Sequence, residues 1–215
     1  PVLTELRRSG ELSAGTRRAL ATRAFQATAA YDAAISAWFA DGGHDRFPET
    51  TVLAFDKALD LAYGENPHQA AALYVERGAR THLLARVEQV HGRELSFNNL
   101  NDLNAARLLL REFAVPACVI VKHANPCGVA LAETIEDAYE RALAADPLSA
   151  FGGVVVLNRP VSARLGERLA EQFVEVLFAP GFDPSALEVL TEKPNLRILE
   201  DRERRLPLLG EKDAR

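Results

Sequence analysis

An uninterrupted apolar run, Ala117-Cys118-Val119-Ile120-Val121, constrains the fold more than any other feature of this sequence. Apolar and polar residues do not alternate along it, as they would in a strand with one face in water. A strand of this kind is covered by helices on both faces. The run therefore predicts a central strand of a layered α/β sheet.

The segments around this run continue the same pattern from about residue 50 onward. We expect strands near 51–55, 116–121, 153–158, 174–178 and 196–199. We expect helices near 67–76, 101–113, 133–145, 162–171 and 184–192. Strands and helices that alternate in this way predict an α/β domain with a substantially parallel sheet.

A long helix is predicted before this domain, over residues 12–39, with Ser13 as its cap. Apolar side chains recur along it at three- and four-residue spacing, at Leu20, Ala24, Ala27, Tyr31, Ala34 and Trp38. The stretch 41–45, Asp-Gly-Gly-His-Asp, ends the helix and Pro48 follows, so we place a domain boundary there. Residues 200–215 are rich in charge and predict a surface segment or a link to a further part.

The composition argues against two classes of partner, nucleic acids and membranes. The net charge of −5 comes from interleaved acids and bases, with no basic stripe of the kind that binds nucleic acid. Apolar runs are too short to cross a bilayer, and the N-terminus lacks the pattern of a signal peptide. Two cysteines make no disulfide framework. We therefore expect a cytoplasmic protein without a nucleic-acid or membrane partner.

The segment 122–128, Lys-His-Ala-Asn-Pro-Cys-Gly, is the sharpest candidate for chemistry. The apolar strand runs directly into Lys122 and His123 and then into a Pro/Gly turn. Ligands of open α/β sheets bind beyond the carboxyl ends of strands, and a histidine can move a proton near neutral pH. From this spacing alone, a pair of ordinary loop residues remains an equal alternative.

A second candidate is the segment 63–69, Tyr-Gly-Glu-Asn-Pro-His-Gln. Asn66 can cap a helix and Pro67 suits its first position. The free N–H groups of a helix N-terminus bind anions, so a phosphate would fit there with His68 in the first turn. A plain capped helix is the simpler interpretation of these residues.

Three further stretches of the sequence could contact a ligand. In the segment 146–153, Gly152 lets backbone approach closely and Phe151 could cover a flat ring, although a tight turn explains both. Asn98 and Asn99 suit either helix capping or a carboxamide ligand. Glu175 lies inside an apolar run and needs a partner, for which a ribose diol and solvent at a strand end are the alternatives.

The same residues do not match the pattern of a zinc site. Zinc deaminases combine His-x-Glu with Pro-Cys-x-x-Cys. Here Ala124 and Asn125 follow His123, and no second cysteine follows Cys127 at that spacing. We therefore predict no metal, and Cys118 is interpreted as a core residue of its strand.

Five segments, in their order and spacing, closely resemble the AICAR transformylase/IMP cyclohydrolase family. They are YGENPHQ (63–69), LSFNNLND (95–102), PACVIVKHANPCG (116–128), DPLSAFGGVVVLNRPV (146–161) and FVEVLFAP (173–180). The resemblance extends from about residue 1 to about residue 199. Several long motifs in register make a chance match very improbable.

The resemblance implies an architecture. Residues 1–45 correspond to the C-terminal helical part of the cyclohydrolase domain. Residues 50–199 correspond to the first cytidine-deaminase-like lobe of the transformylase domain, an α/β lobe with a mixed, largely parallel sheet. Residues 200–215 lead toward a second lobe. We therefore expect a fragment that is inactive alone, cut after the cyclohydrolase active site and before the second lobe.

The resemblance also implies a reaction. In this family a formyl group passes from the co-substrate 10-formyltetrahydrofolate to the 5-amino group of the nucleotide AICAR, and the cyclohydrolase closes the ring to IMP; the family works as a homodimer. Carried over by residue, His123 resembles the proton-abstracting base and Lys122 its partner. The substrate-binding positions implied in the same way are Tyr63, Gly64, His68, Asn99, Phe151, Gly152 and Glu175.

One position departs from the family. In the family an arginine usually comes just before Tyr63 of the YGENPHQ segment, and this chain has Ala62 at that position. Such an arginine is expected to hold the phosphate bidentately, so its absence predicts weaker phosphate binding unless the helix start at Pro67 or a different residue compensates. Beside the transferase hypothesis we therefore keep a different class of function, a non-catalytic nucleotide-binding or assembly module.

Overall fold

A computed structural model describes residues 2–41, 47–77 and 87–201. The chain divides into two compact units, Pro1–Lys57 with Tyr74–Arg80 and Ala58–Leu73 with Thr81–Arg215. Most of the predicted boundary at 41–45 and most of the tail 200–215 lie outside the described residues. The domain limits inferred from the sequence therefore stay predictions.

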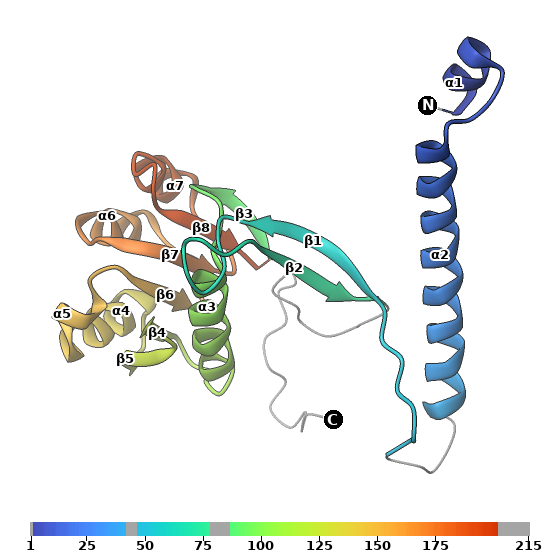
Figure 1. Ribbon diagram of the computed structural model, residues 1–215. Helices are drawn as coiled ribbons and strands as arrows, with labels where there is room; N and C mark the ends of the chain where they lie inside the picture. The colour runs from blue at the N-terminus through green and yellow to red at the C-terminus, as the bar shows by residue number, and fades with distance from the viewer. Residues whose placement is uncertain (1, 42–46, 78–86, 202–215) are drawn as a thin grey trace. The chain divides into compact units, whose positions relative to one another are not determined.

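The first unit contains the predicted long helix. A short helix α1 (Val2–Ser9) precedes α2 (Ala14–Asp41), which confirms the helix expected over 12–39 (Figure 1). Ser13 caps α2 as expected, because its Oγ accepts a hydrogen bond of 3.2 Å from the Thr16 N–H. The apolar stripe of α2 is largely exposed, with Trp38 at 72%.

A β-hairpin replaces two of the predicted elements. Strands β1 (Phe55–Leu61) and β2 (Ala71–Glu76) form a two-stranded sheet, so the strand expected at 51–55 and the helix expected at 67–76 are both wrong. The Gln69 N–H donates to the Asn66 carbonyl at 3.0 Å, which closes a β-turn with Pro67 at its second position. Proline fixes a φ that suits this turn as well as a helix start, and here the turn forms.

The second unit is built on a six-stranded mixed sheet with the order β3-β8-β7-β6-β4-β5. Its strands are β3 (Glu88–His91), β4 (Ala117–Lys122), β5 (Asn125–Leu131), β6 (Gly153–Leu157), β7 (Val174–Ala179) and β8 (Arg197–Glu200). Strands β6, β7 and β8 are parallel to one another. Strand β3 pairs antiparallel with β8, β4 pairs antiparallel with β6, and β5 pairs antiparallel with β4. The α/β class, the mixed sheet and the last four predicted strands are confirmed.

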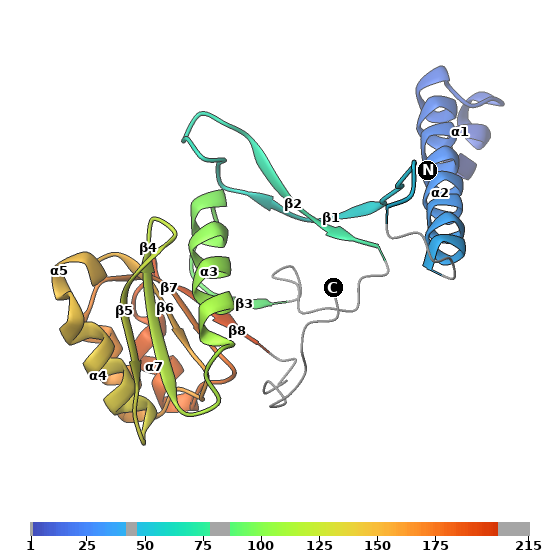
Figure 2. The same cartoon turned by 90° about the horizontal axis from the view of Figure 1, so that it is seen from below.

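Helices cover both faces of this sheet, as the apolar run of β4 predicts (Figure 2). Cys118 and Ile120 pack into a core with α4 (Ile135–Ala145), α6 (Ala163–Glu171) and α7 (Pro184–Thr191). Val119 and Val121 pack on the other face against α3 (Phe97–Leu110). None of the helices that the structure describes is both long and apolar enough to cross a bilayer.

The helix α3 begins earlier than the predicted residue 101, because its cap lies upstream of the paired asparagines. Ser96 is the N-cap, and its Oγ accepts from the Asn99 N–H at 3.2 Å. Asn99 reciprocates, since its Oδ1 accepts from the Ser96 N–H at 3.1 Å. This capping box fixes the helix start at Phe97.

The expected Pro/Gly turn after Lys122 is also wrong. Pro126 and Gly128 lie inside β5, and the turn is the pair His123–Ala124. Strand β5 is the last strand of the sheet, so the N–H that Pro126 lacks is not needed for a further neighbour. Gly128 is required by packing, because a Cβ there would lie 2.1 Å from the Ala142 carbonyl oxygen of α4.

Candidate functional site

The tight turn between β4 and β5 displays the predicted base. Lys122 pairs with Asn125, and His123 and Ala124 between them have φ of 54° and 59°. Two residues of positive φ are the pattern of a type I′ hairpin turn, which normally takes Asn-Gly. Each L-residue in this conformation costs roughly 1–2 kcal/mol. His123 is exposed at the tip of this strained turn.

Two hydrogen bonds hold the turn. The Ala124 N–H donates to Asp102 Oδ1 of α3 at 2.7 Å. Asn125 Nδ2 donates to the His123 carbonyl at 2.8 Å. The first bond joins the turn to helix α3, whereas the second lies within the hairpin itself.

The edge of the sheet at which the site lies differs from the expectation. Strand β4 runs antiparallel to β6, with Val121 opposite Val154, and Gly153 pairs with Val174 at the start of β7. The carboxyl end of β4 therefore lies beside the amino ends of β6 and β7. The rule that places ligands at the carboxyl ends of parallel strands does not locate this site.

Lys122 connects the turn to the start of β6. Its Nζ donates to the Phe151 carbonyl at 2.7 Å. Phe151 follows the short helix α5 (Pro147–Ala150), is 58% exposed, and lies against Phe173 with ring centroids 5.0 Å apart. Gly152 has a φ of 72°, and a Cβ there would lie 3.2 Å from the Phe173 ring. The backbone conformation therefore favours glycine here, and an added Cβ would also crowd the Phe173 ring.

Asn99 and Glu175 meet through their side chains. Asn99 is buried at 4% exposure, and its Nδ2 donates to Glu175 Oε2 at 3.1 Å. The carboxylate on β7 thus has the partner that its apolar surroundings require. The Asn99 side-chain oxygen takes part in the capping box, and its side-chain nitrogen binds Glu175. The same amide group therefore stabilises the helix start and orients the carboxylate.

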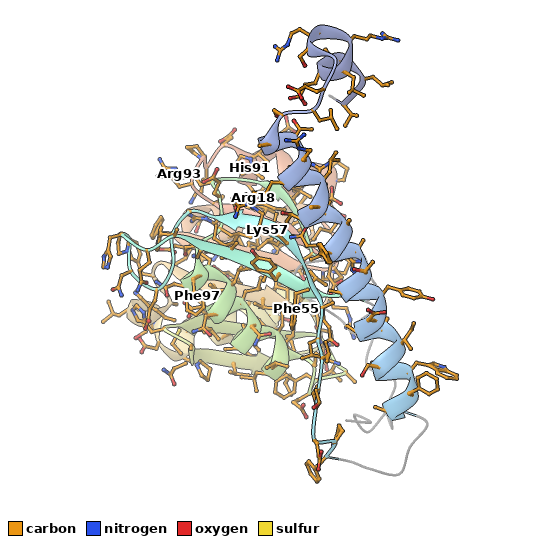
Figure 3. The ribbon with its side chains drawn as sticks, turned by 45° about the vertical axis from the view of Figure 1, so that its right-hand side comes forward. Arg18, Phe55, Lys57, His91, Arg93 and Phe97 are labelled. Carbon is orange, nitrogen blue, oxygen red and sulfur yellow. The ribbon has the colours of Figure 1, made fainter. Side chains whose placement is uncertain are left out.

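The Tyr63–Gly64 segment is docked on the start of α3. The Phe97 N–H donates to the Tyr63 carbonyl at 3.0 Å, and Asn98 Nδ2 donates to the Glu65 carbonyl at 3.1 Å. Phe97 is half exposed at this end of α3 (Figure 3). Gly64 is buried against Gln69, where a Cβ would lie 2.9 Å from the Gln69 Cβ.

His68 is exposed in the 66–69 turn, and within the described residues no hydrogen bond ties it to the others. Since Pro67 starts no helix, the helix N-terminus that was predicted to bind a phosphate does not form. It therefore cannot replace the phosphate contact of the arginine that is missing at position 62.

Two residues with clear structural roles were not among the predicted site residues. Asp102 anchors the turn, and Phe173 packs on Phe151 while its carbonyl accepts from the Gly152 N–H at 2.8 Å. Both lie inside the family-like segments of the sequence. For Asp102 the available signal was an acidic residue nearly two turns after the Ser96 cap of α3.

The two thiols are free and differ in burial. Cys118 is fully buried, and burial raises its pKa. Burial also raises the pKa of Cys127, whose thiol lies 3.6 Å from the Ile120 carbonyl. Within the described ranges, no group of three or more His, Cys, Asp or Glu side chains is placed to hold a metal ion.

The comparisons with known proteins agree with the motifs. Curated relatives named bifunctional purine biosynthesis protein PurH, from Bacillus cereus (strain B4264), Bacillus anthracis and Bacillus mycoides (strain KBAB4), are each 48% identical over 198 residues. These alignments cover 92% of this chain but 39% of each relative, so the chain spans about two fifths of their length. The family model described as the AICARFT/IMPCHase bienzyme matches residues 1–212, and the chain belongs to this family.

Proposed function

We propose that the second unit carries part of the site at which AICAR is formylated by 10-formyltetrahydrofolate in purine biosynthesis. The observation that carries this proposal is the gathering of predicted residues around α3 and the β4–β5 turn. Lys122 contacts Phe151, Asn99 contacts Glu175, and the Tyr63 segment is docked on the same helix. Membership of the family and the relatives' role in purine biosynthesis support it.

The chemistry assigned to these residues follows from the substrate amine. That amine is weakly nucleophilic, because its electrons delocalise into the ring and the carboxamide. As it attacks the formyl carbon, its proton passes to His123, which is exposed and held in a fixed turn. The C–N bond to AICAR forms, the bond from the formyl carbon to the folate nitrogen breaks, and that nitrogen takes up a proton.

The neighbouring groups position the nucleotide. Lys122 is fixed by the Phe151 carbonyl, so its ammonium stays beside His123 to assist proton transfer and to stabilise the developing oxyanion. Glu175, oriented by Asn99, accepts from the ribose diol, and Phe151 and Gly152 face the imidazole. Tyr63, Gly64 and His68 lie near the phosphate.

The remaining parts of the proposal concern the whole enzyme. We assign ring closure to IMP to a cyclohydrolase domain and propose a homodimer in the cytoplasm, without a metal, nucleic-acid or membrane partner. The family resemblance is the support for these assignments.

The test is His123→Ala in a full-length enzyme that contains these residues. Loss of a positioned base is expected to lower kcat by roughly a hundredfold or more, while AICAR affinity measured by calorimetry changes much less. His91→Ala is the matched control, since His91 lies on β3 at the opposite edge of the sheet. A near-normal kcat in His123→Ala would remove His123 from the mechanism.

A second candidate function is a nucleotide-binding or assembly module without catalysis. Ala62 favours it, because the usual phosphate-binding arginine is missing and Ala62 is exposed beside Tyr63. Such a module binds AICAR without formyl transfer, and His123→Ala then leaves every measured property unchanged. Turnover in the full-length enzyme separates the two functions.

A further inference from the structure

We propose that Asp102 is a positioning residue that holds His123 at the tip of the β4–β5 turn. Its part in catalysis rests on the proposed function above, whereas its part in the turn geometry rests on the structure alone.

The turn needs an anchor because its residue types do not suit its conformation. A type I′ turn places both central residues at positive φ, which Asn-Gly adopts easily. Here the pair is His123–Ala124, at 54° and 59°. Ala124 has no polar side chain that could form a compensating local bond. An isolated hairpin with this sequence would favour other turn conformations, in which His123 points elsewhere.

Asp102 supplies the anchor from outside the hairpin. Its carboxylate accepts the Ala124 N–H at 2.7 Å, a short charge-assisted bond. The carboxylate itself is well placed, because the next residue, Leu103, is buried at 1% exposure and fastens α3 to the sheet. The turn is thus tied to a rigid element rather than to a loop.

The same helix also fixes the opposite side of the site. Asn99 and Asp102 are three residues apart on α3 and therefore lie on one face of the helix. Asn99 orients Glu175 and Asp102 orients the His123 turn. Helix α3 therefore sets the spacing between the carboxylate proposed for the ribose and the base proposed for the amine.

The experiment compares Asp102→Ala, Ala124→Gly and the double variant. Glycine adopts positive φ without the steric cost that alanine has, so it stabilises the same turn without the anchor. If Asp102 acts by holding the turn, Ala124→Gly repairs Asp102→Ala. A residue needed only for helix stability, or one that acted directly on substrate, would not be repaired in this way. Asn104→Ala, at an exposed position of the same helix, is the control.

The first readout is independent of any activity. In the 215-residue chain, hydrogen exchange at the amide of residue 124, corrected for intrinsic rate, is expected to quicken about tenfold or more in Asp102→Ala. In the double variant, NMR is expected to recover at His123 the strong intraresidue HN–Hα contact that marks positive φ in an L-residue. Asp102→Asn keeps a hydrogen-bond acceptor without its charge. Its exchange rate at the residue 124 amide is expected to lie between those of wild type and Asp102→Ala.

The second readout is kinetic and uses the full-length enzyme. Asp102→Ala is expected to lower kcat at least about tenfold with the KM for AICAR within about twofold, and Ala124→Gly to restore most of the loss. Unchanged exchange at residue 124 in Asp102→Ala overturns the anchor, and so does a double variant that is as impaired as the single one. If His123→Ala shows no effect but exchange responds as expected, the proposed function fails while the turn anchor stands.

Discussion

Asn99 Nδ2 donates a hydrogen bond of 3.1 Å to Glu175 Oε2, which joins the first turn of α3 to strand β7. The same amide accepts the Ser96 N–H through its oxygen. One buried side chain therefore caps a helix and orients a carboxylate of the candidate site. A change at Asn99 can separate these two roles.

Asn99→Asp keeps an oxygen for the capping box but places a second carboxylate against Glu175. Two carboxylates at this distance cannot both ionise without cost. We expect the variant to be less stable than wild type by about 1–2 kcal/mol at pH 7, since it loses one buried hydrogen bond and gains repulsion. The deficit should shrink near pH 4, where one proton shared by the pair restores a bond. Urea unfolding at the two pH values measures it.

Asn101→Asp is the control for this experiment, because it adds the same charge at an exposed position of α3. A deficit in Asn99→Asp that is equal at both pH values would contradict the role of Glu175 and leave only a capping defect.

The pH dependence of stability at Asp146 can be predicted with its sign. Hydrogen bonds from the Ser149 hydroxyl and then from the Ser149 N–H lower the pKa of Asp146. A lowered folded-state pKa contributes stability above the unfolded pKa of about 3.9, and the contribution is lost as the pH falls through the folded value. Ser149→Ala should therefore lower the urea midpoint at pH 7, and the midpoints of the variant and the wild type should converge as the pH falls through the lowered pKa of Asp146.

Thr191→Ala is the control for Ser149→Ala. Its hydroxyl donates to the Leu187 carbonyl at 2.7 Å rather than to a carboxylate, so its effect should not follow the same titration. If the Ser149→Ala variant kept the same loss of stability in acid, that loss would not come from the hydrogen bonds to the ionised Asp146 carboxylate.

Much of the second unit could be predicted from local sequence, for a physical reason. The apolar run of β4 can only be stable between two helical layers, and Cys118 and Val119 do lie in the cores on opposite faces. The helices with clear caps and amphipathic spacing, such as Ile135–Ala145, were located well. In these segments local propensity and burial favour the same structure.

The errors arose where one local signal suits two structures. Pro67 fits both a helix start and a β-turn, and the pairing of the two flanking strands, β1 and β2, decides between them. Gly128 resembles a turn residue, yet its role is close packing under α4. The left-handed turn at His123 left no local signal at all, because Asp102, which holds it, lies on another element. Contacts between distant segments cannot be obtained from propensity.

The two cysteines should react in a fixed order with iodoacetamide at pH 8. Burial raises the pKa of Cys118 and excludes reagent, whereas Cys127 is partly accessible at the edge strand. We expect mass spectrometry to show one label in the native chain, on Cys127, and two in urea. The native Cys127→Ser variant should stay unlabelled. A native label on Cys118 would show that the sheet opens far more readily than its packing indicates.

Restoring the family arginine at position 62 should strengthen nucleotide binding. The backbone there is already fixed, because the Ala62 N–H donates to the Leu95 carbonyl at 2.8 Å, and the side chain is exposed beside Tyr63. A guanidinium can hold a phosphate through two parallel charge-assisted bonds, worth roughly 1.5–3 kcal/mol. We therefore expect Ala62→Arg in the full-length enzyme to lower the Kd for AICAR about tenfold or more, as measured by calorimetry.

Two sets of comparisons test whether the gain in AICAR affinity comes from the phosphate: one changes the ligand and the other changes the side chain at position 62. The riboside that lacks the phosphate should bind Ala62→Arg no better than wild type. Ala62→Lys should gain less than Ala62→Arg, since an ammonium supplies charge without the planar fork, and Ala62→Gln should gain little. The gain should also fall as salt is added, because exposed charges are screened. An equal gain for the riboside would show that the arginine acts on the Tyr63 segment itself and that the phosphate lies elsewhere.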